Sequence, residues 1–283
     1  MQLQLFKTLW GFVGHFEEAA AQAVAAGFNG LEGQVPKQAE AQQALRAALQ
    51  AHDLGFIAEI TTGGSYVPDR QASMGQHLAD LEAGLDRCQG FDPHLVTVIA
   101  GCDAWSEQES QDFFMQAMAL GARYGVVLCF ETHRSRSLFN PWVTQRLLEV
   151  LPDMQLTVDF SHWCVVCERL LDTELDVIEA IAPRVRHIHA RIGYDQGPQV
   201  PHPAAPEYAE ALAAHQRWWE LCWDAQRNRG FTCTTMTPEF GPDGYLHQLP
   251  FTAAPVADLW QINRWVGDRE RNHFETFLSR PRS

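Results

Sequence analysis

Four side chains that can bind a metal ion stand at or near the ends of four successive β-prone segments. The segments are VVLCFE, LTVDF, VRHIHAR and CTTMTPE, and the four side chains are Glu131, Asp159, His189 and Glu239. Two glutamates, one aspartate and one histidine suit a divalent ion of borderline hardness, namely Mn²⁺, Mg²⁺, Co²⁺ or Zn²⁺. Three carboxylates brought together without a cation would repel one another and take up protons. The residue types therefore predict one divalent metal ion, if the fold brings these segment ends together.

The parity of residues within the segments favours the same interpretation. Successive side chains of a strand point to opposite faces, and HIHAR places His187, His189 and Arg191 on one face with apolar residues on the other. Glu131 and Asp159 each follow an apolar residue of opposite parity. A polar face of this kind needs a specific partner, because unpaired buried charges are costly. For Asp159 alone, a strand end followed by a helix cap is an equally simple interpretation, and only the four residues together favour a metal site.

The segments belong to a longer alternation of β-prone and helical patterns. Strands are expected at 3–9, 28–33, 55–61, 94–100, 126–131, 156–160, 185–191 and 233–239. Helices are expected at 15–27, 37–55, 71–88, 106–125, 140–153, 172–183, 206–230 and 255–278. Eight βα units predict an α/β fold, a (β/α)8 barrel forming a single domain over residues 1–283. A doubly wound sheet is the alternative, but the glycine-rich phosphate loop that usually follows its first strand is missing.

Composition excludes several classes of function. The formal net charge of −14 argues against a nucleic-acid groove and against an anionic membrane surface, because both require clustered lysine and arginine. Seven cysteines, an odd number, indicate free thiols rather than a disulfide framework. The start of the chain lacks the pattern of a secretion signal, and no segment is long and apolar enough to span a membrane. We therefore expect a cytoplasmic protein.

Two connections are longer than the others, residues 62–75 and 192–208, and both follow strand ends. Because active sites of barrels lie at the carboxyl ends of the strands, these connections are expected either to cover a pocket or to be ordinary surface loops. Further residues near strand ends are candidates for the pocket wall. They are Lys7, Trp10, Glu59, His133 and Arg134.

Four motifs carry a resemblance to a known family: FETH (130–133), VDFSHW (158–163), HIHARIG (187–193) and TPEFGP (237–242). Over essentially the whole chain, the sequence resembles the xylose isomerase-like TIM barrel superfamily of sugar isomerases and epimerases. The resemblance implies that the metal ligands are Glu131, Asp159, His189 and Glu239. It also implies that His162 and Arg191 bind the substrate. Independently of the resemblance, His133 and Trp10 are expected to bind the substrate by shaping the pocket, because they lie near strand ends.

The activity implied by the resemblance is isomerisation or epimerisation of a keto-sugar by proton transfer through a metal-stabilised enediolate. Glu131 and Glu239 would be the catalytic acid and base. The segment RIGYDQGPQVPHP differs from the loops typical of ketose epimerases, so a lyase or dehydratase acting by β-elimination is the alternative. A non-catalytic sugar-binding barrel is the second. The expected partner is a small carbohydrate, and since family members often dimerise, the aromatic pair Trp218–Trp219 marks a helix that either packs in the core or forms a homodimer interface.

Overall fold

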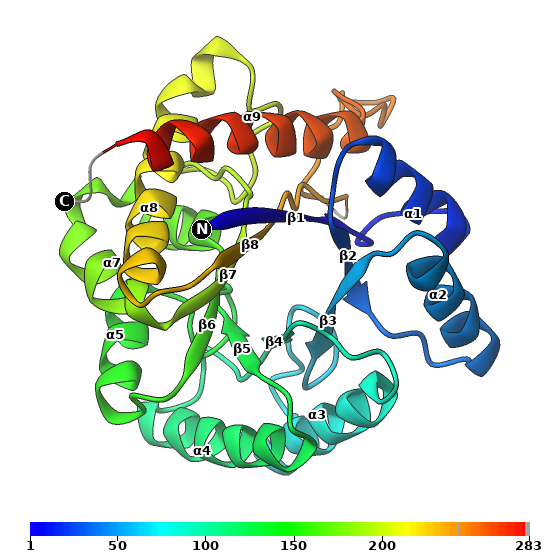
Figure 1. Ribbon diagram of the computed structural model, residues 1–283. Helices are drawn as coiled ribbons and strands as arrows, with labels where there is room; N and C mark the ends of the chain where they lie inside the picture. Colours follow the sequence, from blue (N-terminus) through cyan, green and yellow to red (C-terminus); the bar gives the residue numbers. More distant parts are fainter. Residues whose placement is uncertain (243, 281–283) are drawn as a thin grey trace.

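Eight parallel strands close into a barrel in which β8 returns to pair with β1 (Figure 1). The computed structural model describes residues 1–242 and 244–280. The strands are β1 Gln2–Thr8, β2 Gly30–Gln34, β3 Gly55–Thr61, β4 Val96–Ile99, β5 Leu128–Glu131, β6 Gln155–Val158, β7 Val185–His189 and β8 Cys233–Thr237. Each begins and ends within two residues of its predicted bounds. The predicted (β/α)8 fold, a single TIM barrel domain, is confirmed, and the pairing of β8 with β1 rules out an open sheet.

Helices follow the strands and surround the barrel (Figure 1). They are α1 Phe16–Ala25, α2 Ala39–Ala51, α3 Met74–Cys88, α4 Glu107–Tyr124, α5 Pro141–Val150, α6 Phe160–Cys167, α7 Leu175–Ile181, α8 Ala209–Asn228 and α9 Leu259–Ser279. Short polar residues set several of the starts. Ser73 and Ser106 form capping boxes with the third residue of α3 and α4, and the side chain of Asn140 caps α5. The short helix α6, which begins directly after β6, is the element that the sequence pattern did not predict.

The inside of the barrel has an apolar floor and a polar mouth. Phe6, Ile57, Leu95 and Cys129 form a buried cluster within the barrel, separate from the larger core between strands and helices. Further along the strands toward their carboxyl ends, the inward side chains become polar. The apolar cluster fills one end of the barrel. The polar groups lie at the other end, where the carboxyl ends of the strands meet, as is usual for this fold.

The aromatic pair of α8 lies inside the protein. Trp218 and Trp219 of α8 are both fully buried, so this pair packs in the core and offers no surface for a dimer. A homodimer therefore stays a prediction without support from these side chains.

All seven cysteines are free thiols, as expected. Among the described helices, none is long and apolar enough to cross a membrane.

A buried carboxyl group lies between α8 and α9, far along the chain from the predicted ligands. Glu270 is fully buried, and its Oε1 accepts a hydrogen bond of 2.7 Å from Nε2 of Gln216. Its Oε2 has no hydrogen-bond partner among the described residues. Burial raises the pKa of Glu270 from its ordinary value of 4.5 to about 8. Since the unfolded chain releases this proton at lower pH than the folded protein does, ionisation of Glu270 favours unfolding.

Glu270→Gln is expected to stabilise the protein, because an amide of the same size carries no charge to bury. The wild type should lose stability relative to the variant as pH rises from about 4.5 to about 8, the interval between the two pKa values. The gain in free energy of unfolding at the upper end should be about 1–3 kcal/mol. Urea unfolding near both ends of this interval measures it. Glu275→Gln, on the exposed side of the same helix, is the control, and a gain that does not grow with pH would contradict the prediction.

Candidate metal centre and active site

The four predicted ligands meet at the carboxyl ends of strands β5 to β8. Glu131 and His189 are the last residues of β5 and β7. Asp159 follows β6 directly, and Glu239 lies two residues beyond the end of β8. Their ligand atoms all lie within 4.8 Å of one another, and all four side chains are buried. The structure thus brings together the residues that the sequence singled out.

Asp159 satisfies both interpretations that its sequence position allowed. It is the N-cap of α6, and its Oδ1 accepts a hydrogen bond of 2.9 Å from the backbone N–H of Ser161. Its Oδ2 lies 2.5 Å from Nη2 of Arg191, within the ligand cluster. A cap at this position holds the carboxylate rigidly, because one oxygen is tied to the helix while the other faces the site.

The cluster has the spacing and the unsatisfied atoms that a divalent ion would use. Oε2 of Glu131 and Nδ1 of His189 make no hydrogen bond among the described residues, although buried polar atoms are normally paired. Nδ1 of His189 lies 3.1 Å from Oε2 of Glu239 and 3.4 Å from Oε1 of Glu131. Two ligand atoms on a tetrahedral ion with bonds of about 2.1 Å would be about 3.4 Å apart, close to both distances. The residues present therefore fit the predicted metal.

The electrostatics of the cluster also favour a positive charge at its centre. Burial is the main cause that raises the pKa of Glu131 to about 7, with repulsion from Glu239 adding to it and His189 opposing it. Burial likewise raises the pKa of Asp159, against the attraction of Arg191. Burial alone would lower the pKa of His189, but the surrounding carboxylates outweigh it and raise this pKa well above its usual range. Negative charge from neighbouring carboxylates contributes to each of these shifts, and a bound cation would offset it.

Arg191 and His162 form a second layer beside the ligands. Nη2 of Arg191 lies 2.6 Å from Nε2 of His162, and since a guanidinium can only donate, Nε2 of His162 accepts. Burial, together with His133 and Arg191, lowers the pKa of His162 well below its usual range, so its ring is neutral. His162 is fully buried in the first turn of α6 and is not among the residues that line the cavity, so its contact with substrate stays a prediction. In the structure its ring contacts Arg191 through Nε2.

A cavity of about 650 Å³ opens at the mouth of the barrel, above the ligand cluster. Of the residues predicted to bind substrate, Trp10, His133 and Arg191 line it. The ring of His133 stacks on that of His162, with centroids 3.8 Å apart. The volume lies within the usual range for small-molecule sites, about 300–1,000 Å³.

Aromatic side chains form one wall of the cavity. The rings of Trp10 and Tyr245 meet edge to face with centroids 5.1 Å apart, and the guanidinium of Arg191 lies 4.8 Å from the Tyr245 ring. Gly241 allows this arrangement, because a Cβ there would lie 1.9 Å from the Trp10 ring. Sequence reasoning missed Tyr245. The available signal was an aromatic residue in the connection that follows the strand of Glu239.

Two further candidates for the pocket wall, Glu59 and Lys7, lie in different places. Glu59 lines the cavity, and its Oε1 accepts a hydrogen bond of 3.3 Å from Gln34, another residue that the sequence did not single out. Lys7 instead lies on the outer side of β1, with its ammonium group 3.9 Å from the centre of the Trp260 ring. The strand parity explains this difference, because Phe6 on β1 points into the barrel and its neighbour must point outward.

The connection at 62–75 contributes to the cavity as expected. Gly64, Ser65 and Tyr66 line its wall. Arg136 donates hydrogen bonds to the backbone carbonyl groups of Thr62, Ser65 and Tyr66 and so ties this connection to the barrel. The connection at 192–208 does not border the cavity, although Gln199 exchanges hydrogen bonds with the backbone of Gly241 beneath Trp10. This second connection therefore supports the wall from outside.

Three solved structures have the same fold at low sequence identity. L-ribulose 3-epimerase is 14% identical with a TM-score of 0.67, covering 98% of this chain and 96% of its own. The IOLI protein with a binding zinc atom is 12% identical with a TM-score of 0.66, covering 99% and 100%. The 3-keto-D-glucoside 4-epimerase YcjR from E. coli is 13% identical with a TM-score of 0.64, covering 96% and 100%. At such identities the likeness shows the fold alone.

The family is shown by a separate comparison. No curated protein sequence matches this chain. The family described as "Xylose isomerase-like TIM barrel" matches residues 20–196, which is more than half of the 283 residues. The match includes the strands that carry Glu131, Asp159 and His189. The chain belongs to the xylose isomerase-like TIM barrel family.

Proposed function

We propose that this protein is a divalent-metal-dependent isomerase or epimerase of a keto-sugar. The observation that carries the proposal is that two of the four proposed ligands face the cavity and two do not. Glu131 and Glu239 border the cavity, whereas Asp159 and His189 are buried outside its wall. Two glutamates facing a cavity across one cation site are the groups needed to move a proton on a bound sugar. The similarity to two sugar epimerases and to a zinc-containing protein supports both the substrate class and the ion.

The ion would be held by Glu131, Asp159, His189 and Glu239, and Mn²⁺, Mg²⁺, Co²⁺ and Zn²⁺ are all compatible with these ligands. When bound, it would act as a Lewis acid that polarises the carbonyl group and offsets the charge developing on the substrate oxygens.

The two glutamates would carry the proton. One takes it from the carbon beside the carbonyl group and leaves an enediolate of the sugar. The other glutamate, protonated at that stage, returns a proton to the opposite face of the same carbon, which epimerises the sugar, or to the neighbouring carbon. In the second case the hydroxyl proton also moves to the adjacent oxygen, and the sugar is isomerised. Burial raises the pKa of Glu131 to about 7 in the absence of the ion; a bound cation would lower this pKa and keep the group in the carboxylate form that accepts a proton.

The surrounding residues would bind and orient the sugar. Arg191 lines the cavity and would stabilise the negative charge of the enediolate, while His162 holds the guanidinium in place. His133 would contact a hydroxyl group. Trp10 and Tyr245 would pack against the apolar face of the sugar carbons.

Proton exchange with solvent tests the proposal. The purified protein is analysed for metal and incubated in D₂O with a panel of ketoses and keto-sugars, before and after treatment with a chelator and after Mn²⁺ or Zn²⁺ is restored. We expect about one ion per chain, and metal-dependent deuteration beside the carbonyl group, detected by NMR. Loss of a substituent instead of exchange would favour the lyase alternative. Protein that binds no ion and exchanges no proton would contradict the proposal.

A further inference from the structure

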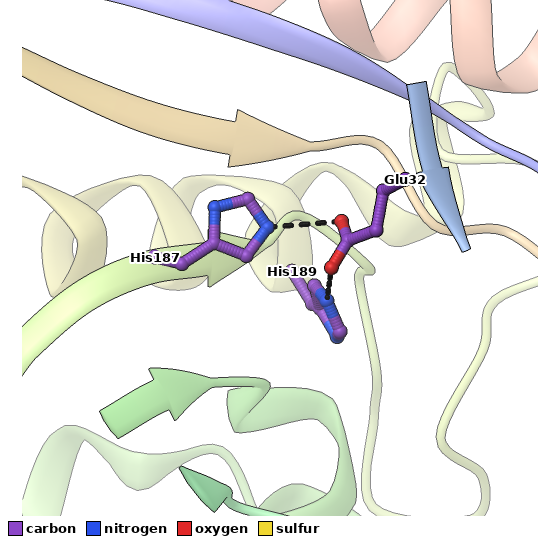
Figure 2. A group of neighbouring side chains, drawn as sticks. All are labelled: Glu32, His187 and His189. Atoms are coloured by element: carbon purple, nitrogen blue, oxygen red, sulfur yellow. Dashed lines mark hydrogen bonds and ion pairs between the residues drawn. The ribbon is translucent and has the colours of Figure 1, made fainter. Parts of the chain in front are cut away.

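A second group of titratable side chains lies inside the barrel next to the ligand cluster. Glu32 of β2 sits between His187 and His189 of β7, and all three are buried (Figure 2). Oε2 of Glu32 is 3.0 Å from Nε2 of His187, and Oε1 is 3.0 Å from Nε2 of His189. Neither Glu32 nor His187 was a candidate in the sequence, and neither borders the cavity.

Further hydrogen bonds fix the Glu32 carboxylate in place. Its Oε1 also accepts from Oγ1 of Thr97 at 3.1 Å. On the far side, Nδ1 of His187 lies 2.8 Å from Oγ1 of Thr235. The result is a continuous chain of contacts that runs from Thr235 through His187 and Glu32 to His189.

The hydrogen bonds around Glu32 determine which atoms donate. Its Oε1 accepts a hydrogen bond from Thr97 and lies 3.0 Å from Nε2 of His189. Because this oxygen acts as an acceptor, Nε2 of His189 must be the donor of the contact between them. The ring of His189 therefore carries a proton on Nε2, the nitrogen that faces Glu32.

A second metal ion held by these three residues is the competing interpretation, because their ligand atoms lie close enough together. Each of those atoms already has a hydrogen-bond partner within the group, unlike Nδ1 of His189 on the other side of the ring. The three residues also lack an exchangeable position, since neither Glu32 nor His187 meets the cavity. The hydrogen-bonded interpretation accounts for every atom and needs no ion.

We infer that Glu32 is a positioning residue for the metal centre: by accepting the Nε2 proton of His189, it leaves the lone pair of Nδ1 directed at Glu131 and Glu239. The inference rests on the proposed function, since it assumes an ion between these glutamates. A histidine ligand whose other nitrogen donates to a carboxylate is held in one tautomer and one ring orientation, and it is a more basic ligand. His187 contributes indirectly, by holding the second oxygen of Glu32.

The first test uses the wild-type protein and so does not depend on a variant folding. Histidine ring nitrogens are observed by ¹H–¹⁵N NMR in protein loaded with Zn²⁺. We expect His189 to show a protonated Nε2 that exchanges slowly with solvent and an Nδ1 shifted by the metal. A His189 ring bound to zinc through Nε2 would overturn the inference. Failure of the wild type to bind any ion would instead overturn the proposed function.

The second test removes the carboxylate. In Glu32→Gln, affinity for Zn²⁺ or Mn²⁺ is expected to fall about 10–100-fold, and the visible absorption spectrum of the Co²⁺ form should change, because the His189 ring is no longer fixed. Glu270→Gln is the matched control: it removes another buried carboxyl group, which lies between α8 and α9 and accepts a hydrogen bond from Gln216. Equal affinities in Glu32→Gln and the wild type, or an equal loss in Glu270→Gln, would overturn the positioning role.

Discussion

Glu239→Gln is expected to lower turnover by about a thousandfold or more while the barrel stays folded. Glutamine has the same size, so the packing around Trp10 and Arg191 should persist, but an amide cannot take up a proton at neutral pH. Glu239 borders the cavity and lies 3.1 Å from Nδ1 of His189 and 4.0 Å from Nη1 of Arg191. These contacts put its carboxylate beside both the proposed ion and the residue proposed to stabilise the enediolate.

Both glutamates are proposed ligands, and Glu131→Gln should have the larger effect on metal binding. Oε2 of Glu131 is a fully buried atom without a hydrogen-bond partner among the described residues, so the ion would be its main interaction. We expect metal affinity to fall at least about a hundredfold, because one anionic ligand is lost from a buried site. Metal analysis of the purified variant, beside turnover, separates this loss from a loss of proton transfer.

The matched control for both variants is Glu275→Gln, which removes an exposed carboxylate from α9 and should change neither metal content nor turnover. Circular dichroism and thermal unfolding establish that the variants are folded. A Glu239→Gln protein that turns over at the wild-type rate would remove Glu239 from the mechanism. A Glu131→Gln protein that retains its full complement of metal would remove Glu131 from the ligand set.

Arg136→Met is expected to lower the free energy of unfolding by about 2–4 kcal/mol, since several buried carbonyl groups would lose their donors at once. Arg136 is fully buried. Its Nη1 donates to the carbonyl oxygens of Thr62 at 2.7 Å and Gly101 at 3.0 Å, and its Nε donates to that of Tyr66 at 3.0 Å. Burial lowers the pKa of Arg136 only to about 10, so the side chain is a cation at neutral pH.

The same change should loosen the wall of the cavity. Because Arg136 ties residues 62–75 to the barrel, its loss should raise KM for the substrate and expose that segment to limited proteolysis. Arg136→Lys keeps the charge but cannot reproduce the planar set of donors, so an intermediate loss is expected. Arg70→Met, at an exposed position in the same segment, should have little effect. Wild-type stability in Arg136→Met would show that the carbonyl groups find other partners.

Local patterns in the sequence were sufficient to predict the architecture. Short β-prone runs between helical patterns predicted each strand within two residues of its observed bounds, because both patterns depend on near neighbours in the chain. The four ligands could be found for a related reason. In a barrel of parallel strands the carboxyl ends lie on one face, so metal-binding residues near the ends of four consecutive strands must converge.

Contacts between distant segments could be decided only by the tertiary structure. Glu32 meets His189 although 157 positions separate them, because barrel closure and register, not spacing along the chain, bring β2 opposite β7. His162 shows the same limit: its motif placed it near the site, but the direction of α6 after Asp159 buried its ring behind Arg191 and away from the cavity. The sequence by itself thus determined the barrel and which residues could bind an ion. The positions of Glu32, His162 and Arg136 depended on how strands and connections pack, since each contact is set by the whole barrel at once.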